Sequence, residues 1–306
     1  MKYALGIEIG KTKLQLFVGS EALQVEERLY CPIEKEASVQ AIRYQIESAV
    51  RDLQKKYRFA AVGVGFGGPV DRTRGSAVLS DDWAQFDLID WMEDLAHCPT
   101  VLENDANTAG FAEAILGAGK GFSTVFYANL STGVGGGLIQ SGEIYHGARP
   151  GESQLGQLRL DRAGTTLESL VSGWAVDARI KKEVEQYPDS LLATLTVQKP
   201  EAKCLLPAME QGDELAIRIV NETAETLAWG LSHAIHLFHP EIIVLGGGLA
   251  LIGQPLRDAV EKAFPDFVME AFRPLPKLVL SELKHEAIPI GALLLARHRL
   301  VTSNFE

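Results

Sequence analysis

The sequence predicts an α/β protein of two similar domains with a cleft between them. Short apolar runs alternate with amphipathic segments along most of the chain, which is the rhythm of α/β folds. A pattern of strand, Gly/Thr turn and strand occurs twice, with turns at residues 10–12 and 131–136. A chain of 306 residues is also long enough for two domains.

The first repeat predicts a hairpin at the N-terminus. Residues 3–9 and 13–18 have the pattern of buried strands, and Gly10-Lys11-Thr12 joins them as a tight turn. Backbone N–H groups of such a turn can converge on a phosphate, and the Thr12 hydroxyl adds a donor. An ordinary hairpin without a ligand is the alternative interpretation of the same residues.

A strand-to-helix junction predicts the position of the chemistry. Residues 38–57 form an amphipathic helix pattern, and residues 60–66 form a strand that Gly67-Gly68 ends. The apolar run 99–102 then leads through Glu103-Asn104-Asp105-Ala106-Asn107 into a helical segment. Because α/β proteins place functional side chains at such junctions, Asp105 is the candidate general base.

The second half repeats the strand and turn pattern. Strands are expected at 123–130 and 137–140, followed by a long polar loop over 143–160. Residues 213–238 predict one long helix, and 241–245 a buried strand that ends in Gly246-Gly247-Gly248. Such a glycine triplet lets a ligand approach the backbone. A helix over 254–264, a strand near 278–280 and a helix over 289–299 complete the chain.

Two groups of side chains have both a binding and a packing interpretation. His233, His236 and His239 could hold a metal, or they could lie at a helix end facing the carbonyl dipole. Trp83 and Trp91 could stack on a sugar or pack in the core. The packing interpretation is the preferred one in each case.

Composition excludes several classes of protein. The net charge of −11 argues against a broad nucleic-acid surface. Three widely spaced cysteines, without a Cys-x-x-Cys pair, indicate neither a disulfide framework nor a zinc finger. No signal peptide and no apolar run long enough to span a bilayer is apparent, so a cytoplasmic location is expected.

Four motifs in order resemble those of the ROK family of bacterial repressors, open reading frames and sugar kinases. Residues 8–13 match the family's Asp-x-Gly-Gly-Thr-Lys, and residues 103–107 match its Glu-Asn-Asp-Ala-Asn completely. Residues 131–137 match its second phosphate hairpin, and residues 239–248 match its nucleoside segment. The resemblance covers nearly the whole chain and implies an actin-like ATPase (ribonuclease H-like) fold. It places one domain at 1–106 plus 290–306 and the other at 107–289.

The resemblance implies phosphoryl transfer from ATP to a sugar hydroxyl. Asp105 would accept the hydroxyl proton, and Mg²⁺ carried with ATP would lie near Glu8. The sugar-binding residues that it implies are Gly68, Asn104, Asp105, Gln154, Gln157 and Glu168. The residues implied for ATP are Glu8, Gly10, Lys11, Thr12, Lys13, Thr132, Gly133, Gly247 and Gly248. Family members are commonly dimers, so a homodimer is expected.

Several positions depart from the family pattern. The family's Gly-Glu-x-Gly-His loop is Ser153-Gln154-Leu155-Gly156-Gln157 here, so two sugar ligands have become Gln154 and Gln157. The family's zinc module keeps only its final acid, Glu168, and no structural zinc is expected. Glu8 replaces Asp and Lys11 replaces Gly in the first phosphate turn. A positive φ at Lys11 would cost about 1 kcal/mol or more.

Three functions are therefore weighed. The preferred one is an ATP-dependent sugar kinase, because the Asn104-Asp105 pair is intact. The alternative is a catalytically weak or inactive sugar- or nucleotide-binding protein of the same fold. A sugar-responsive repressor is disfavoured, since only two residues precede Tyr3 and the family's repressors carry a helix-turn-helix there.

Overall fold

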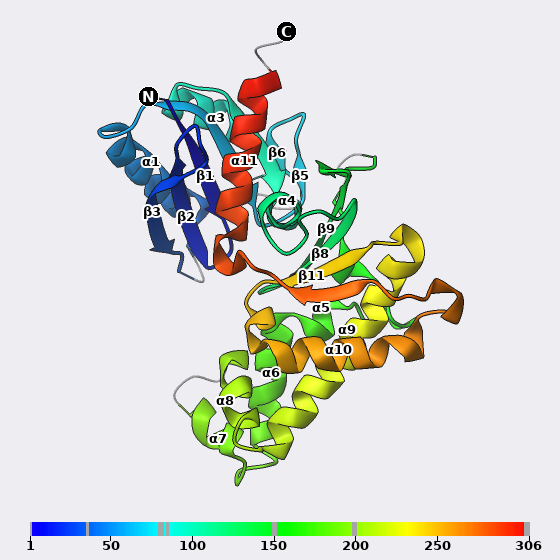
Figure 1. Cartoon of the computed structure of the whole chain (residues 1–306). Coiled ribbons are helices and arrows are strands. Elements are labelled where there is room, and N and C mark those ends of the chain that lie inside the picture. The colour runs from blue at the N-terminus through cyan, green and yellow to red at the C-terminus, as the bar shows by residue number, and fades with distance from the viewer. Residues whose placement is uncertain are drawn as a thin grey trace. The chain divides into compact units, whose positions relative to one another are not determined.

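The chain divides into two compact units in the computed structural model (Figure 1), which describes residues 2–34, 37–78, 83, 86–148, 152–197 and 201–302. Unit 1 comprises Met1–Ala112, Ile144–Glu152 and Glu286–Glu306, and unit 2 comprises Glu113–Glu143 and Ser153–His285. The family resemblance had predicted one domain at residues 1–106 plus 290–306 and the other at residues 107–289.

Unit 1 contains a five-stranded mixed sheet in the order β3-β2-β1-β4-β7. The strands are β1 (Tyr3–Ile9), β2 (Lys13–Gly19), β3 (Val25–Pro32), β4 (Phe59–Phe66) and β7 (Thr100–Asn104). The hairpin partners β1, β2 and β3 are antiparallel, whereas β1, β4 and β7 are parallel. The carboxyl ends of three strands therefore meet at one edge of the sheet, where the short hairpin β5 (Val70–Asp71) and β6 (Ser76–Ala77) follows β4.

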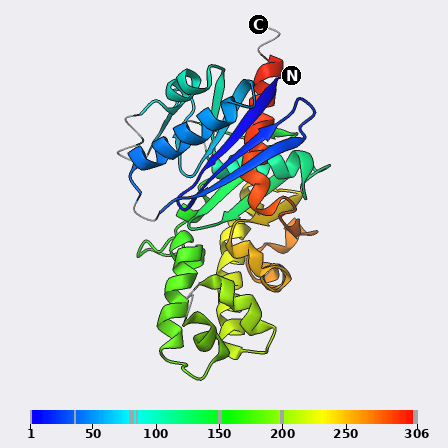
Figure 2. The same cartoon turned by 90° about the vertical axis from the view of Figure 1, so that its left-hand side faces the viewer.

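Alternate residues along the strands of unit 1 face opposite sides of the sheet, and different helices cover the two sides. Leu5 and Ile7 face a core shared with α1 (Val39–Gln54) and α3 (Leu88–Ala96). Gly6 and Gly63 face α11 (Ala287–Thr302) on the other side, where a Cβ at Gly63 would lie 1.9 Å from the Ala292 carbonyl oxygen. Figure 2 shows α11 crossing the sheet behind the strands. Glycine is thus required for this close helix–sheet contact.

Unit 2 repeats the sheet of unit 1. Its order is β10-β9-β8-β11-β12, with strands at Glu143–Ile144, Val134–Gln140, Thr124–Leu130, Ile242–Gly246 and Lys277–Leu280 respectively. As in unit 1, the hairpin pair β8 and β9 is antiparallel, and β8, β11 and β12 are parallel. The equal strand order confirms the internal repeat that the two Gly/Thr turns predicted.

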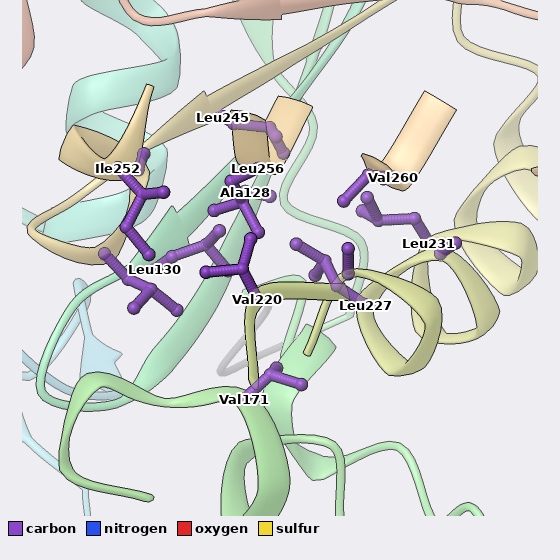
Figure 3. Close-up of a cluster of buried hydrophobic side chains, with 14 of the residues drawn as sticks. Ala128, Leu130, Val171, Val220, Leu227, Leu231, Leu245, Ile252, Leu256 and Val260 are labelled. Atoms are coloured by element: carbon purple, nitrogen blue, oxygen red, sulfur yellow. The ribbon is translucent and has the colours of Figure 1, made fainter. Parts of the chain in front are cut away.

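The helices of unit 2 build a large apolar core on one face of its sheet. They are α5 (Glu168–Val171), α6 (Gly173–Val184), α7 (Leu191–Thr196), α8 (Leu205–Met209), α9 (Glu214–Phe238) and α10 (Gln254–Phe267), while α4 (Asp105–Leu116) crosses the unit boundary. Short 3₁₀ turns are η1 (Leu155–Gln157), η2 (Ala202–Cys204), η3 (Leu249–Ile252), η4 (Glu270–Phe272) and η5 (Lys284–Glu286). Figure 3 shows strand residues Ala128, Leu130 and Leu245 packed among side chains of α5, α9 and α10.

Tertiary contacts support the packing interpretation of both ambiguous groups. Trp83 is buried against Phe66, and Trp91 donates its indole N–H to Glu47. His236 accepts a hydrogen bond from the Met269 backbone N–H, and His239 is the left-handed residue after α9. Within the described ranges, no group of three or more His, Cys, Asp or Glu side chains could hold a metal.

Among the described residues, no helix has the length and apolarity needed to cross a membrane.

Candidate active site

The β7–α4 junction holds Asp105 through the backbone of its own helix. Asn104 is the last residue of β7, and its Oδ1 accepts from the N–H groups of Ala106 and Asn107 at 2.9 and 3.1 Å. This is the geometry of a helix N-cap, which asparagine favours. Asp105 Oδ1 accepts from the Ala106 N–H at 2.8 Å and from Asn104 Nδ2 at 3.2 Å. The carboxylate therefore lies at the positive end of α4 with a defined orientation.

The carboxyl of Asp105 has an unusually high pKa for an aspartate. Burial raises the pKa of its carboxyl to about 7, and the negative charge of Glu8 adds to the rise. The Ala106 N–H, Lys13 and Lys11 act in the opposite direction. Because a general base is most effective when its pKa lies near the working pH, this value suits proton abstraction near neutrality.

Glycines after β4 border this carboxylate. The Gly67 N–H donates to the Ile9 carbonyl at 2.8 Å, and a Cβ at Gly67 would lie 3.8 Å from Asp105 Oδ2. The Gly68 carbonyl accepts from Asn104 Nδ2 at 3.0 Å. Unit 1 thus brings Gly68, Asn104 and Asp105 together, because the carboxyl ends of the paired parallel strands β4 and β7 lie side by side.

Glu8 is already bonded on both of its carboxylate oxygens. Lys13 Nζ lies 2.9 Å from Oε1, and Gln15 Nε2 donates to Oε2 at 2.6 Å, while Glu8 itself is only 2% exposed. A metal bound to Glu8 would have to displace an ion pair and a hydrogen bond. The carboxylate oxygens of Glu8 therefore do not fit a metal ion held by the protein, and the proposed chemistry uses no such ion.

The first Gly/Thr turn accommodates lysine without backbone strain. The Gly10 N–H donates to the Lys13 carbonyl at 3.0 Å, and the Thr12 carbonyl accepts from Ile33 at 3.0 Å. Lys11 is exposed and is not among the residues with positive φ. The cost that a left-handed conformation would impose on Lys11 therefore does not arise.

Unit 1 also contains a buried carboxylate, Glu103, whose partners the sequence did not predict. Glu103 Oε1 accepts from the Asn104 N–H at 2.9 Å and from Asn107 Nδ2 at 3.0 Å. Its Oε2 lies 2.7 Å from His146 Nε2 and 3.8 Å from Arg72 Nη1. The sequence could have indicated these partners, because Glu103 ends an apolar strand pattern and a buried carboxylate requires partners. His146 and Arg72 lie in polar loops whose pattern carries no such signal.

Unit 2 contains the other residues that were expected to bind ATP. The turn after β8 contains Thr132 and Gly133, and Gly247 and Gly248 follow the neighbouring parallel strand β11. Gly247 has φ +85°, and a Cβ there would lie 2.3 Å from the Leu130 carbonyl oxygen. Glycine is therefore required at position 247, whereas the space around Gly248 is open.

The three remaining sugar candidates also lie in unit 2, in two different settings. Gln154 precedes η1 and Gln157 ends it, and both residues are exposed. Glu168 begins α5 and is half-buried, and its Oε2 accepts from the Val134 N–H at 2.8 Å. Glu168 therefore contacts the turn expected to bind phosphate.

Comparison with known proteins agrees with the fold and the motifs. Two units with the same mixed-sheet order, each with Gly-rich turns at the carboxyl ends of its parallel strands, define the actin-like ATPase fold. The chain belongs to the ROK family, whose model matches residues 4–299.

Relatives within the family include both enzymes and regulators. A glucokinase of Streptomyces coelicolor is 30% identical over 315 residues, which cover 97% of this chain and 98% of the relative. The crystal structure of a ROK family glucokinase from Streptomyces griseus in complex with glucose and AMPPNP has a TM-score of 0.87 and 28% identity, covering 97% and 99% of the two chains. The transcriptional regulator NagC of Escherichia coli is 23% identical over 98% of this chain and 76% of its own length.

Proposed function

We propose that this protein is an ATP-dependent sugar kinase with Asp105 as its general base. The observation that carries the proposal is the carboxyl of Asp105, with a pKa of about 7, held at the N-terminus of α4 by Asn104. Glucose is the first substrate to test, because related proteins with 28–30% identity are glucokinases.

The proposed mechanism needs little covalent work from the protein. The oxygen of the sugar hydroxyl attacks the γ-phosphorus of Mg-ATP, and ADP leaves. The ionised Asp105 carboxylate accepts the proton that this hydroxyl loses. Gly67 places no side chain beside Asp105 Oδ2, so a hydroxyl can approach there. The backbone turns at Gly10–Thr12 and Thr132–Gly133 supply N–H donors for the phosphates, and Gly247 and Gly248 allow the nucleoside to lie against the backbone.

Asn104 is assigned to positioning Asp105. Its amide has two donors and two acceptor positions, and the protein uses all four: Gly68 and Asp105 accept, and Ala106 and Asn107 donate. A sugar hydroxyl would therefore have to compete with bonds that orient the base. Gln154 and Gln157 are left as exposed neutral amides for the sugar in place of the family's Glu and His.

The proposal is tested by measuring ADP release from Mg-ATP with glucose, mannose, N-acetylglucosamine and N-acetylmannosamine, beside Asp105→Asn. The expected result is turnover with at least one aldohexose that exceeds the rate of the variant. Turnover no faster than that of the variant with every sugar would reject the kinase. In that case, a sugar-dependent rise in Tm would support the binding protein instead. A homodimer, which family membership suggests, is tested separately by light scattering.

The pH dependence of kcat/KM is expected to follow Asp105. Activity should rise through an acid limb near pH 7, because the base must be ionised. Glu8→Gln removes a negative neighbour and should move the limb down by roughly one pH unit. Lys11→Gln removes a positive neighbour and should move it up by less. Shifts in the same direction, or none, would show that another group controls the limb.

A further inference from the structure

We infer that Glu168 positions the second phosphate turn, residues 131–134, and that its negative charge weakens nucleotide binding at that turn. The inference rests on the proposed function, since it concerns how ATP is held. It differs from the sequence-based expectation, in which Glu168 binds the sugar.

Two hydrogen bonds hold the turn from α5 and α6, and a third closes the turn itself. The Val134 N–H donates to Glu168 Oε2 at 2.8 Å, and the Gly173 N–H donates to the Ser131 carbonyl at 2.8 Å. Within the turn, the Ser131 N–H donates to the Gly133 carbonyl at 2.8 Å. Glu168 is the only side chain among these partners, and a bond from a backbone N–H to a carboxylate is stronger than a neutral one. Removing the carboxylate should therefore loosen the turn.

The carboxylate also lies against the backbone that would approach a phosphate. A Cβ at Gly133 would come within 2.6 Å of Glu168 Oε2, so the carboxylate packs directly on the Gly133 Cα. In the described part of the chain, no Lys, Arg or His forms an ion pair with Glu168. A nucleotide phosphate at Thr132–Gly133 would thus meet a like charge that no neighbouring cation neutralises.

The same contact connects the turn with the segment that carries Gln154 and Gln157. A Cβ at Gly156 would lie 2.3 Å from the Val134 carbonyl oxygen and 3.1 Å from Glu168 Cβ. A β-bridge between Gly136 and Ser153 fixes the start of that segment on β9. Glu168 therefore packs between the turn and the glutamine segment.

The test compares Glu168→Gln with Glu168→Ala. Glutamine keeps an acceptor for the Val134 N–H and removes the charge, so Kd for Mg-AMPPNP, measured by calorimetry without sugar, should fall about threefold. Alanine also removes the acceptor, so Kd should rise about tenfold. Glu185→Ala, an exposed acid at the end of α6, is the matched control and should leave Kd unchanged. The Tm of each variant shows that it is folded.

Each outcome separates this inference from the proposed function. A Glu168→Gln variant that binds glucose more weakly, with unchanged Kd for Mg-AMPPNP, would overturn the inference and return Glu168 to the sugar. If the wild-type protein binds no Mg-AMPPNP, the proposed function and the effect of charge both fail. Hydrogen exchange then still decides the positioning role, because Glu168→Ala should speed exchange of the peptide 131–136 and Glu168→Gln should not. Equal exchange in the wild type and Glu168→Ala would overturn that role.

Discussion

Asp105→Asn is expected to lower kcat for sugar phosphorylation by about 10³-fold, within the range that general-base catalysis contributes. The amide can still accept from Ala106 and Asn104, so the junction should keep its geometry while the proton acceptor is lost. The measurement is ADP release at saturating Mg-ATP and sugar. KM for ATP should change little, because the change affects the transition state more than the bound nucleotide.

Asp87→Asn is the matched control, since Asp87 is also an acid at a helix N-terminus of unit 1, where it caps α3. It should keep kcat within twofold of the wild type. Asp105→Asn with more than a tenth of wild-type kcat would contradict the assignment of the base.

The loss of activity should not come from unfolding, because ionised Asp105 costs the folded state stability. Its pKa is about 7 in the fold and 3.8 without its surroundings, so the native state keeps a proton that the unfolded state has lost. The contribution of Asp105 to stability therefore falls as pH rises from about 4 to 7 and stays low above that. Asp105→Asn should then have the higher Tm at pH 8. The gain is at most roughly 4 kcal/mol, and less because the side chain keeps some contact with water.

Gly63→Ala is expected to destabilise the protein by about 3 kcal/mol or more. The added Cβ would lie 1.9 Å from the oxygen and 2.7 Å from the carbon of the Ala292 carbonyl. Both are backbone atoms, so α11 must move as a whole away from β1 and β4, and overpacking of this kind is costly. Since Gly67 and Asp105 follow β4 and its neighbour β7, the shift should also lower activity. The midpoint of urea unfolding measures the effect.

Gly248→Ala is the control for this substitution. Position 248 has an ordinary φ of −63° and no atom within 4 Å of an added Cβ, so the midpoint should stay within experimental error. If Gly63→Ala unfolds at the wild-type urea concentration, α11 does not pack on β4 as closely as described.

The sequence alone determined the fold of this protein and most of its motif positions. Strand periodicity, the two Gly/Thr turns and the glycine triplet depend on neighbours within a few residues, so they are visible in the chain itself. The two sheets confirm the duplication, and β7 leads into α4 at Asn104-Asp105 as predicted. The position of Asp105 at a helix N-terminus required no knowledge of distant residues.

Only the tertiary structure decided which partners these side chains have. Glu8 bonds to Lys13 and, across the hairpin, to Gln15. Glu103 bonds to His146, 43 positions away, and Glu168 bonds to the backbone of a turn 34 positions away. Such contacts arise when strand ends and loops meet in space, and a local pattern carries no information about that meeting. The residue types were in the sequence, whereas their charges acquired a role through burial and through the atoms placed beside them.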